Sequence, residues 1–389
     1  MVVVDMKRKK EVYLDNNATT RIDERVIEPM VEIMKESYGN PSSVYQVGQK
    51  SKRVIEEARE LISGLLGTKS REIMFTSGGT ESNNYAIRGI VQAMEKKGKH
   101  IVSSNIEHSS VKNTLEDLED KGWEVTYLRA DSKGIVSIDE LKKVLRPDTV
   151  LITVMHSNNE IGSLQPIQEI GEIAREKEIY FHVDAVQSIG KVRIDLENID
   201  TLTFASHKFY GPKGVGGLYI KGGTKLDKLI TGGQQERNRR AGTENIAGIF
   251  GMAKALEITL SNMYEEMSNE KELRDLMEKE MSAQIDGVTF NGDMEKRLGN
   301  TSSITLEGVE AESLLLSLDM RGIAVSAGSA CASSTLTPSH VLGAIGLTKS
   351  QAKGTIRVSL GRYTTKDDIE YFVENLKEVV KIEREMSIF

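Results

Sequence analysis

Short β-prone runs and longer amphipathic runs alternate between about residues 70 and 220 of the chain. Strands are expected at 73–76, 100–103, 125–128, 149–155, 180–183 and 201–204. Between them, segments such as 83–97 and 110–121 space their apolar residues as helices do. Strands that alternate with helices predict an α/β fold with a mostly parallel sheet that is covered on both faces. Ligands of such sheets bind beyond the carboxyl ends of the strands.

A long helix marks the passage to a second part of the chain. Residues 252–286 contain neither Gly nor Pro and are rich in Glu, Lys, Leu and Met, which favours a helix. Beyond it we expect strands at 303–306 and 355–359 and helices at 311–320 and 366–385. We therefore predict two domains, a large one of residues 15–264 and a small one of residues 1–14 and 265–389.

Composition narrows the class of protein. The chain has 389 residues, 39% hydrophobic and 28% charged, which is typical of a globular protein with a sizeable core. Its net charge is −7 and no block of Lys and Arg is free of acids, so nucleic-acid binding is not expected. The apolar run at 2–4 is too short for a signal peptide, and no stretch approaches the roughly 18 apolar residues of a membrane helix. We expect a cytoplasmic protein without membrane contact.

Two of the expected strands end in charged residues. The strand at 201–204 leads to Lys208, which a Gly/Pro turn follows, and the strand at 180–183 ends in Asp184. A lysine at the mouth of a buried strand can be partly desolvated, which lowers its pKa and makes it a nucleophile and a base. A Schiff-base lysine and a carboxylate for the ring nitrogen are what pyridoxal phosphate requires of a protein.

Each of these residues also has a simpler explanation. A Lys after a strand is usually a solvated charge, and an Asp after a strand is often a helix N-cap. The coincidence of two strand ends, of His207 beside Lys208 and of a Gly-rich exit favours the functional interpretation.

A Gly-rich turn that contains Gly79 and Thr80 joins the strand at 73–76 to the next helix. The N-terminus of that helix supplies unpaired N–H groups and a positive dipole, which suit a phosphate. Many such turns are Gly-rich merely in order to turn. This one lacks the Gly-Lys-Ser/Thr of a nucleotide-binding loop, which argues against an NTPase.

Further polar residues follow other strands. His108 could stack on a flat heterocycle or be a hydrogen-bonded loop histidine, and Asn158 and Asn159 could bind a ligand or merely form a turn. The simplest explanation of the Gly-flanked polar segment at 232–245 is a charged loop exposed to solvent. Arg357 stands inside an apolar strand and needs a carboxylate partner, either a structural acid or a substrate.

Cys331 is the only cysteine, so no internal disulfide can form. Its segment, residues 326–335, contains no large side chain, buries little and is expected to be mobile. A thiol on a mobile, accessible loop is exposed to reagents, unlike a buried structural thiol. We therefore favour a reactive thiol over a small core residue.

Together these residues resemble one family, the NifS/IscS-like cysteine desulfurases, which are pyridoxal-phosphate enzymes of fold type I within the class V aminotransferases. The matching stretches run in family order over nearly the whole chain. They are residues 13–20, 39–43, 76–84, 107–108, 158–162, 184–187, 207–214, 242–245, 328–331 and 357–362. The resemblance implies a large domain built on a mostly parallel seven-stranded sheet and a smaller α+β domain that carries the cysteine loop.

The resemblance also implies a role for each residue singled out above. The catalytic residues would be Lys208, Cys331 and His108. The residues that bind pyridoxal 5′-phosphate would be Gly79, Thr80, His108, Asn158, Asp184, Gln187, Ser206, His207, Lys208 and, from the second subunit of a homodimer, Thr243. Asp184 would pair with the ring nitrogen, Gln187 would bond to the ring hydroxyl and His108 would stack on the ring. Asn158 and Arg357 would hold the substrate carboxylate, and no metal site is expected.

The chain departs from the family pattern in a few places. Ala205 stands where the family usually has a Ser, and Ser206 comes one residue later. The resemblance therefore leaves open whether a serine hydroxyl binds the phosphate at this place. Tyr45 stands where a His is usual. The sequence stops at Phe389, short of the longer tail that meets a scaffold protein in many relatives, so that contact is open too.

The activity implied by the resemblance is removal of sulfur from L-cysteine. L-Alanine would leave, and a persulfide on Cys331 would pass its sulfur to an acceptor such as an iron–sulfur scaffold protein, for cluster assembly and other thio-cofactors. An aminotransferase or selenocysteine lyase on the same fold would not need Cys331. A phosphate-binding or redox-sensing protein, in which Lys208 is a solvated charge, is the non-enzymatic alternative.

Overall fold

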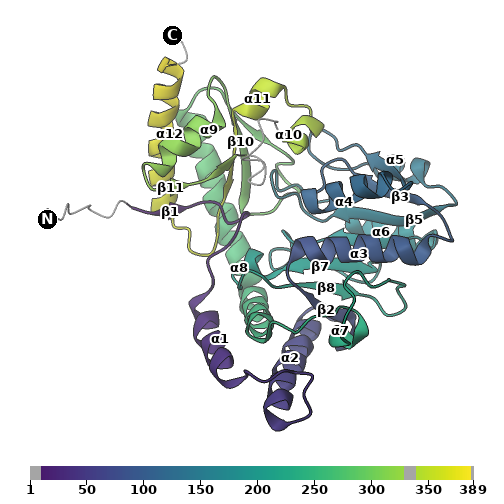
Figure 1. Ribbon diagram of the computed structural model, residues 1–389. Coiled ribbons are helices and arrows are strands. Elements are labelled where there is room, and N and C mark those ends of the chain that lie inside the picture. Colours follow the sequence, from purple (N-terminus) through teal and green to yellow (C-terminus); the bar gives the residue numbers. More distant parts are fainter. Residues whose placement is uncertain (1–9, 328–338, 387–389) are drawn as a thin grey trace.

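The large sheet of the molecule has seven strands. The computed structural model describes residues 10–327 and 339–386, and Figure 1 shows how they are arranged. The order across the sheet is β2-β8-β7-β6-β5-β3-β4, and only β8 runs against its neighbours. The strands are β2 (Ile73–Thr76), β3 (His100–Ser104), β4 (Glu124–Leu128), β5 (Thr149–Met155), β6 (Tyr180–Asp184), β7 (Thr201–Ala205) and β8 (Gly216–Ile220). The predicted seven-stranded, mostly parallel α/β sheet is confirmed.

Helices cover both faces of this sheet because its strands are apolar on both sides. Along β5, Ile152 and Val154 join a core with α2, α5, α6 and α8, whereas Leu151 joins a core with α3 and α4. These helices are α2 (Gln46–Leu65), α3 (Gly79–Met94), α4 (Ser109–Glu119), α5 (Ile138–Val144), α6 (Ile167–Glu176) and α8 (Ile246–Gln284). The other helices of this part are α1 (Glu24–Glu36) and the short α7 (Gln235–Asn238).

A second, antiparallel sheet lies beside the first, in the order β12-β13-β10-β9. Its strands are β9 (Val288–Asn291), β10 (Thr301–Leu306), β12 (Ser326–Ala327) and β13 (Thr355–Ser359). Its helices are α9 (Ala311–Asp319), α10 (His340–Ala344), α11 (Lys349–Lys353) and α12 (Lys366–Met386), and β1 (Val12–Tyr13) pairs with β11 (Ile323–Ala324) nearby. No helix in the described part of the chain combines the length and the apolar character that crossing a membrane requires.

Helix α8 runs from one sheet to the other, with α1 and α2 at one end and α12 at the other (Figure 1). It starts at Ile246, six residues before the predicted start. The prediction began only after the last glycine of this segment, but the helix includes the glycines in its first turns. Gly251 is one of them, and a side chain there would meet Met30 of α1 at 2.3 Å. Leu256 belongs to the first core and Met277 to a separate second core. The domain limits stay a prediction, which these two cores support.

We predict that Gly217→Ala destabilises the strand pair that presents Lys208. Gly217 of β8 lies opposite Phe204 of β7, and an added Cβ would come within 2.1 Å of the Phe204 ring. Overpacking of this kind costs about 1–3 kcal/mol, measurable as a lower free energy of unfolding in urea. The control is Gly64→Ala in α2, where the added Cβ would meet no atom within 4 Å apart from its chain neighbours and the adjacent backbone of its own helix. Equal stability of the two variants would contradict the prediction.

Candidate active site

A cavity of about 640 Å³ lies at the carboxyl end of the large sheet. Several strands deliver residues to it: Asp184 ends β6, Lys208 follows β7 and His108 follows β3. The cavity is lined by eight of the residues singled out in the sequence, namely Gly79, Thr80, His108, Asp184, Gln187, His207, Lys208 and Arg357. The structure therefore brings together most of the predicted site.

Lys208 ends a 3₁₀ turn, Ser206–Lys208, that directly continues β7. Its Nζ donates hydrogen bonds to the backbone carbonyls of Asn17 and Ala18. Both carbonyls belong to the segment that follows β1, so the amine is held at the junction of the two sheets. The same Asn17 carbonyl accepts a bond of 2.8 Å from Nε2 of Gln187. One backbone oxygen thus aligns two residues that line the cavity.

Asp184 is 5% exposed and accepts a hydrogen bond at each carboxylate oxygen. Oδ1 accepts from the backbone N–H of Val186 at 2.9 Å, and Oδ2 accepts from Nδ2 of Asn83 at 2.7 Å. Donors to both oxygens stabilise the ionised form of a carboxyl group. Asp184 can therefore present a negative charge to a cationic ring nitrogen.

Two of the predicted site residues whose side chains line the cavity are histidines. His108 caps α4, where its Nδ1 accepts the backbone N–H of Ser110 at 3.1 Å. Burial lowers the pKa of His108; the charge of Asp184 opposes this shift and the charge of Lys208 reinforces it. Burial, helped by the charges of Lys208 and Lys213, lowers the pKa of His207 to about 4. At neutral pH His207 is therefore uncharged, and the shift at His108 favours its neutral form as well.

The first turn of α3 opens onto the cavity at Gly79 and Thr80. Its N–H groups have no partners within the helix, which suits an anion. A Cβ on Gly79 would lie 2.9 Å from Cγ2 of Val186, so little room for a side chain exists there. Ala205 lines the cavity, whereas Ser206 is absent from its described lining. Ser206 Oγ is buried and has no hydrogen-bond partner among the described residues.

Arg357 lies on β13 and is 2% exposed. Its Nη2 bonds to Asp15 Oδ1 at 2.7 Å, and its Nη1 donates to the carbonyl of Asn159 at 3.1 Å. Within the described residues Nε has no partner. Arg357 is therefore paired with a structural acid, Asp15, and it also lines the cavity.

Asn158 is fully buried, and its side chain is occupied by its own loop. Nδ2 donates to the carbonyl of Ile106 at 2.9 Å, and Oδ1 accepts the backbone N–H groups of Glu160 and Ile161. Asn159, and not Asn158, stands among the described residues that line the cavity. The structure therefore places Asn158 behind the site.

Thr243 is not among the described residues that line this cavity. Thr243 lines a separate cavity of about 110 Å³ together with Ser77 and Arg240. Cys331 lies outside the described residues.

Several residues that line the cavity received no role from the sequence. Asn17, Asn83, Glu107 and Glu160 do so, and all four fall inside the family-like stretches. Glu107 is fully buried, with Oε1 bonded to Ser104 and to the backbone of Met155. Its Oε2 has no partner within the described chain, and burial raises its pKa to about 8. What could have identified these residues in the sequence is their position inside the family-like stretches, not their residue type.

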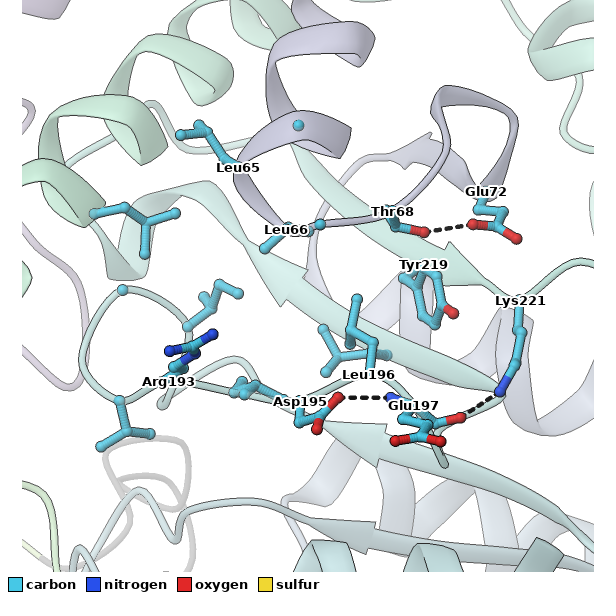
Figure 2. A pocket seen from close by; sticks show the side chains of 18 of the residues that line it. Leu65, Leu66, Thr68, Glu72, Arg193, Asp195, Leu196, Glu197, Tyr219 and Lys221 are labelled. Atoms are coloured by element: carbon cyan, nitrogen blue, oxygen red, sulfur yellow. Dashed lines mark hydrogen bonds between the residues drawn. The ribbon is translucent and has the colours of Figure 1, made fainter.

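A larger cavity, of about 1040 Å³, lies away from the carboxyl ends of the parallel strands (Figure 2). Leu65, Leu66 and Leu196 line part of its wall. Two of its charged groups bond to near neighbours: Glu72 accepts from Thr68, and Lys221 donates to the carbonyl of Glu197. The named groups are thus already satisfied, so the cavity at the strand ends is the stronger candidate.

A lysine, a carboxylate and a helix N-terminus that meet at the ends of adjacent parallel strands define a pyridoxal-phosphate enzyme of fold type I. The donor set fits that cofactor: Lys208 offers an amine, Asp184 an anion for the ring nitrogen, and α3 a site for the phosphate. A family model described as "Aminotransferase class-V" matches residues 12–372, and the chain belongs to this family. Its cofactor is pyridoxal 5′-phosphate.

Several relatives share one description. The chain is 50% identical over 381 residues to "Cysteine desulfurase IscS" of Dictyoglomus turgidum, covering 97% of both chains. It is 50% identical over 380 residues to "Cysteine desulfurase IscS" of Methanosarcina thermophila, covering 97% of this chain and 94% of that one. A solved structure titled "NIFS-LIKE PROTEIN" has a TM-score of 0.91 and 38% identity, and the match covers 96% of this chain and 100% of that one.

We predict that Glu107 makes stability fall as pH rises. Its pKa is raised from 4.5 to about 8, so the folded protein keeps a proton that the unfolded chain has lost. The stabilisation is fully present below pH 4.5 and is lost as pH rises toward 8, by at most about 1.4 kcal/mol per pH unit. Glu107→Gln, which keeps the acceptor for Ser104 and Met155, removes this contribution. Urea unfolding of both proteins from pH 5 to pH 8 tests it, and parallel stability curves would contradict it.

Proposed function

We propose that this chain is a pyridoxal-phosphate-dependent cysteine desulfurase. It takes the sulfur of L-cysteine and releases L-alanine. The observation that carries the proposal is the meeting of Lys208 and Asp184 in one cavity, in a chain 50% identical over 97% of its length to proteins described as cysteine desulfurases. When bound, pyridoxal phosphate withdraws electrons from the bonds at the α-carbon of an amino acid.

Residues that line the cavity would hold the cofactor. Asp184 would pair with the ring nitrogen, Gln187 would bond to the ring hydroxyl and His108 would stack on the ring. Gly79 and Thr80 at the N-terminus of α3 would bind the phosphate together with His207. Because Ala205 rather than Ser206 lines the cavity, the helix N–H groups carry more of the phosphate binding than Ser206 does.

A second subunit completes this site. Thr243 does not belong to the described lining of the cavity that its own chain forms, and we assign it to the phosphate of the partner in a homodimer. The protein acts in the cytoplasm. Its sulfur acceptor is a protein such as an iron–sulfur scaffold, a role that the name IscS of the relatives suggests.

Arg357 orients the substrate. Asp15 and the carbonyl of Asn159 hold two edges of its guanidinium, and the remaining donor capacity receives the carboxylate of L-cysteine. Asn158 serves this contact indirectly, because its side chain shapes the loop that presents the Asn159 carbonyl. Nζ of Lys208 lies within the same cavity and takes the proton from the α-carbon.

Cys331 takes the sulfur. Its thiolate attacks the sulfur of the substrate, an S–S bond forms, and the bond between sulfur and Cβ breaks with its electron pair passing to carbon. Protonation of that carbon gives alanine, and the enzyme keeps a persulfide. A thiolate forms readily near neutral pH, which makes cysteine suited to this step.

We predict that Lys208→Ala lowers alanine formation by about 10²–10⁴-fold, the usual contribution of a general base. Cofactor binds this variant without a covalent bond, because the ring and phosphate contacts remain. After borohydride reduction, mass spectrometry finds the cofactor on the Lys208 peptide of the wild type only. The control is Lys213→Ala, which removes an exposed lysine five residues away. Wild-type turnover by Lys208→Ala would remove this residue from the mechanism.

We predict that Cys331→Ser keeps the cofactor and its absorbance change with L-cysteine but loses about 10²-fold or more of its alanine formation, because a hydroxyl is a poor nucleophile at neutral pH. The test incubates wild type and variant with L-cysteine and a reductant and measures alanine and sulfide together. Without reductant, the wild-type peptide that contains Cys331 gains one sulfur atom. Equal alanine and sulfide from both proteins would favour a lyase or an aminotransferase.

A further inference from the structure

Asn83 touches two elements of the candidate site with one side chain. It lies on α3 and is 1% exposed. Its Nδ2 donates to Oδ2 of Asp184 at 2.7 Å and to Oγ of Ser110 at 2.9 Å. Ser110 Oγ in turn lies 2.9 Å from Nδ1 of His108. The two hydrogens of one amide therefore lead to the carboxylate and to the imidazole that face the cofactor.

The direction of this amide is set from behind. Oδ1 of Asn83 lies 3.1 Å from Nε2 of His182, and Nδ1 of His182 lies 2.9 Å from Oγ1 of Thr201. His182 is fully buried on β6, two residues before Asp184, and burial lowers its pKa to about 3. It is therefore neutral at pH 7 and carries one hydrogen.

One arrangement of hydrogens satisfies the whole network while Asp184 is ionised. The carboxylate needs donors, and it has them in the N–H of Val186 and in Nδ2 of Asn83. Oδ1 of Asn83 must then accept, so Nε2 of His182 carries the hydrogen and its Nδ1 accepts from Thr201. A reversed amide would set its carbonyl oxygen against the carboxylate and leave buried groups without partners, which is costly.

The same arrangement sets the tautomer of His108. Ser110 Oγ accepts from Asn83 and donates to Nδ1 of His108, which also accepts the N–H of Ser110 at 3.1 Å. The hydrogen of a neutral His108 therefore lies on Nε2. The donor to Asp184 and the tautomer of His108 thus depend on the orientation of the same Asn83 amide.

We propose that Asn83 and His182 are positioning residues that keep Asp184 ionised and His108 in its Nε2–H form. This inference rests on the proposed function, in which Asp184 pairs with the pyridine nitrogen of the cofactor. Their effect on that nitrogen is indirect, through the hydrogen bond that Asn83 donates to Asp184. An ionised Asp184 keeps the pyridine nitrogen protonated, which the electron-withdrawing role of the cofactor requires.

The test uses the holoenzyme loaded with cofactor that is ¹⁵N-labelled in its ring. In wild type we expect the ¹⁵N shift of a protonated pyridine. Asn83→Ala, which suits a helix, should move that shift toward the unprotonated value and raise the dissociation constant of pyridoxal phosphate about 10- to 100-fold. His182→Leu should act in the same direction. His182→Gln keeps a donor for Asn83 and should restore both readouts.

His100 supplies a matched control. It is also fully buried on the sheet, and its ring bonds to Thr149 at 2.7 Å and Thr126 at 2.9 Å, but it begins β3 and is not among the described lining of the cavity. His100→Leu should lower the free energy of unfolding and leave the ¹⁵N shift and the dissociation constant unchanged.

The outcomes separate this inference from the proposed function. Wild-type ¹⁵N shifts and affinities in Asn83→Ala and in any folded His182→Leu would overturn the inference, even if stability falls as in His100→Leu. A wild type that binds the cofactor but forms no alanine from L-cysteine would overturn the proposed activity, while the ¹⁵N readout would still decide the inference. A wild type that binds no cofactor would overturn both.

Discussion

The backbone carbonyl of Asn17 is the point on which the candidate site depends. It accepts hydrogen bonds from Nζ of Lys208 and from Nε2 of Gln187, two residues that follow strands of the large sheet. The same residue is anchored to the small sheet, because its N–H donates to Oγ of Ser359 and its side chain to Oγ1 of Thr301. The position of the reactive amine is therefore tied to how the two sheets meet, and a shift between them moves the amine and the Gln187 amide together.

Burial then decides which groups of the site carry charge. Arg357 forms an ion pair with Asp15 at 2.7 Å, and donors reach both oxygens of Asp184. Burial raises the pKa of Glu107 to about 8 and lowers the pKa of His207 to about 4, so it favours the neutral form of both groups. Inside a protein the effective dielectric is lower than in water, so the charges that remain in a buried site act more strongly on one another and on a bound ring.

The alternation of strands and helices was enough to predict the sheet and the edge at which Lys208 and Asp184 meet, because a parallel sheet directs all its carboxyl ends to one side. Strand β8 was not among the strands predicted from the pattern. Its antiparallel direction could not be predicted either, because the direction of a strand leaves no mark on an apolar run. The pattern also could not predict which residues after a strand face the cavity. Ala205 lines the cavity and Ser206 does not, because a 3₁₀ turn begins between them.

Amide side chains were the hardest to assign, since Asn acts through partners that only the fold supplies. Asn158 was expected at the ligand, yet its loop occupies both ends of its amide, whereas Asn83, without an expected role, bonds directly to Asp184. Arg357 raises a related point. A structural acid and a substrate were treated as alternatives for it, but a guanidinium has five N–H donors. Asp15 and the Asn159 carbonyl fix its plane, and a fixed plane is what lets the remaining donors select a carboxylate.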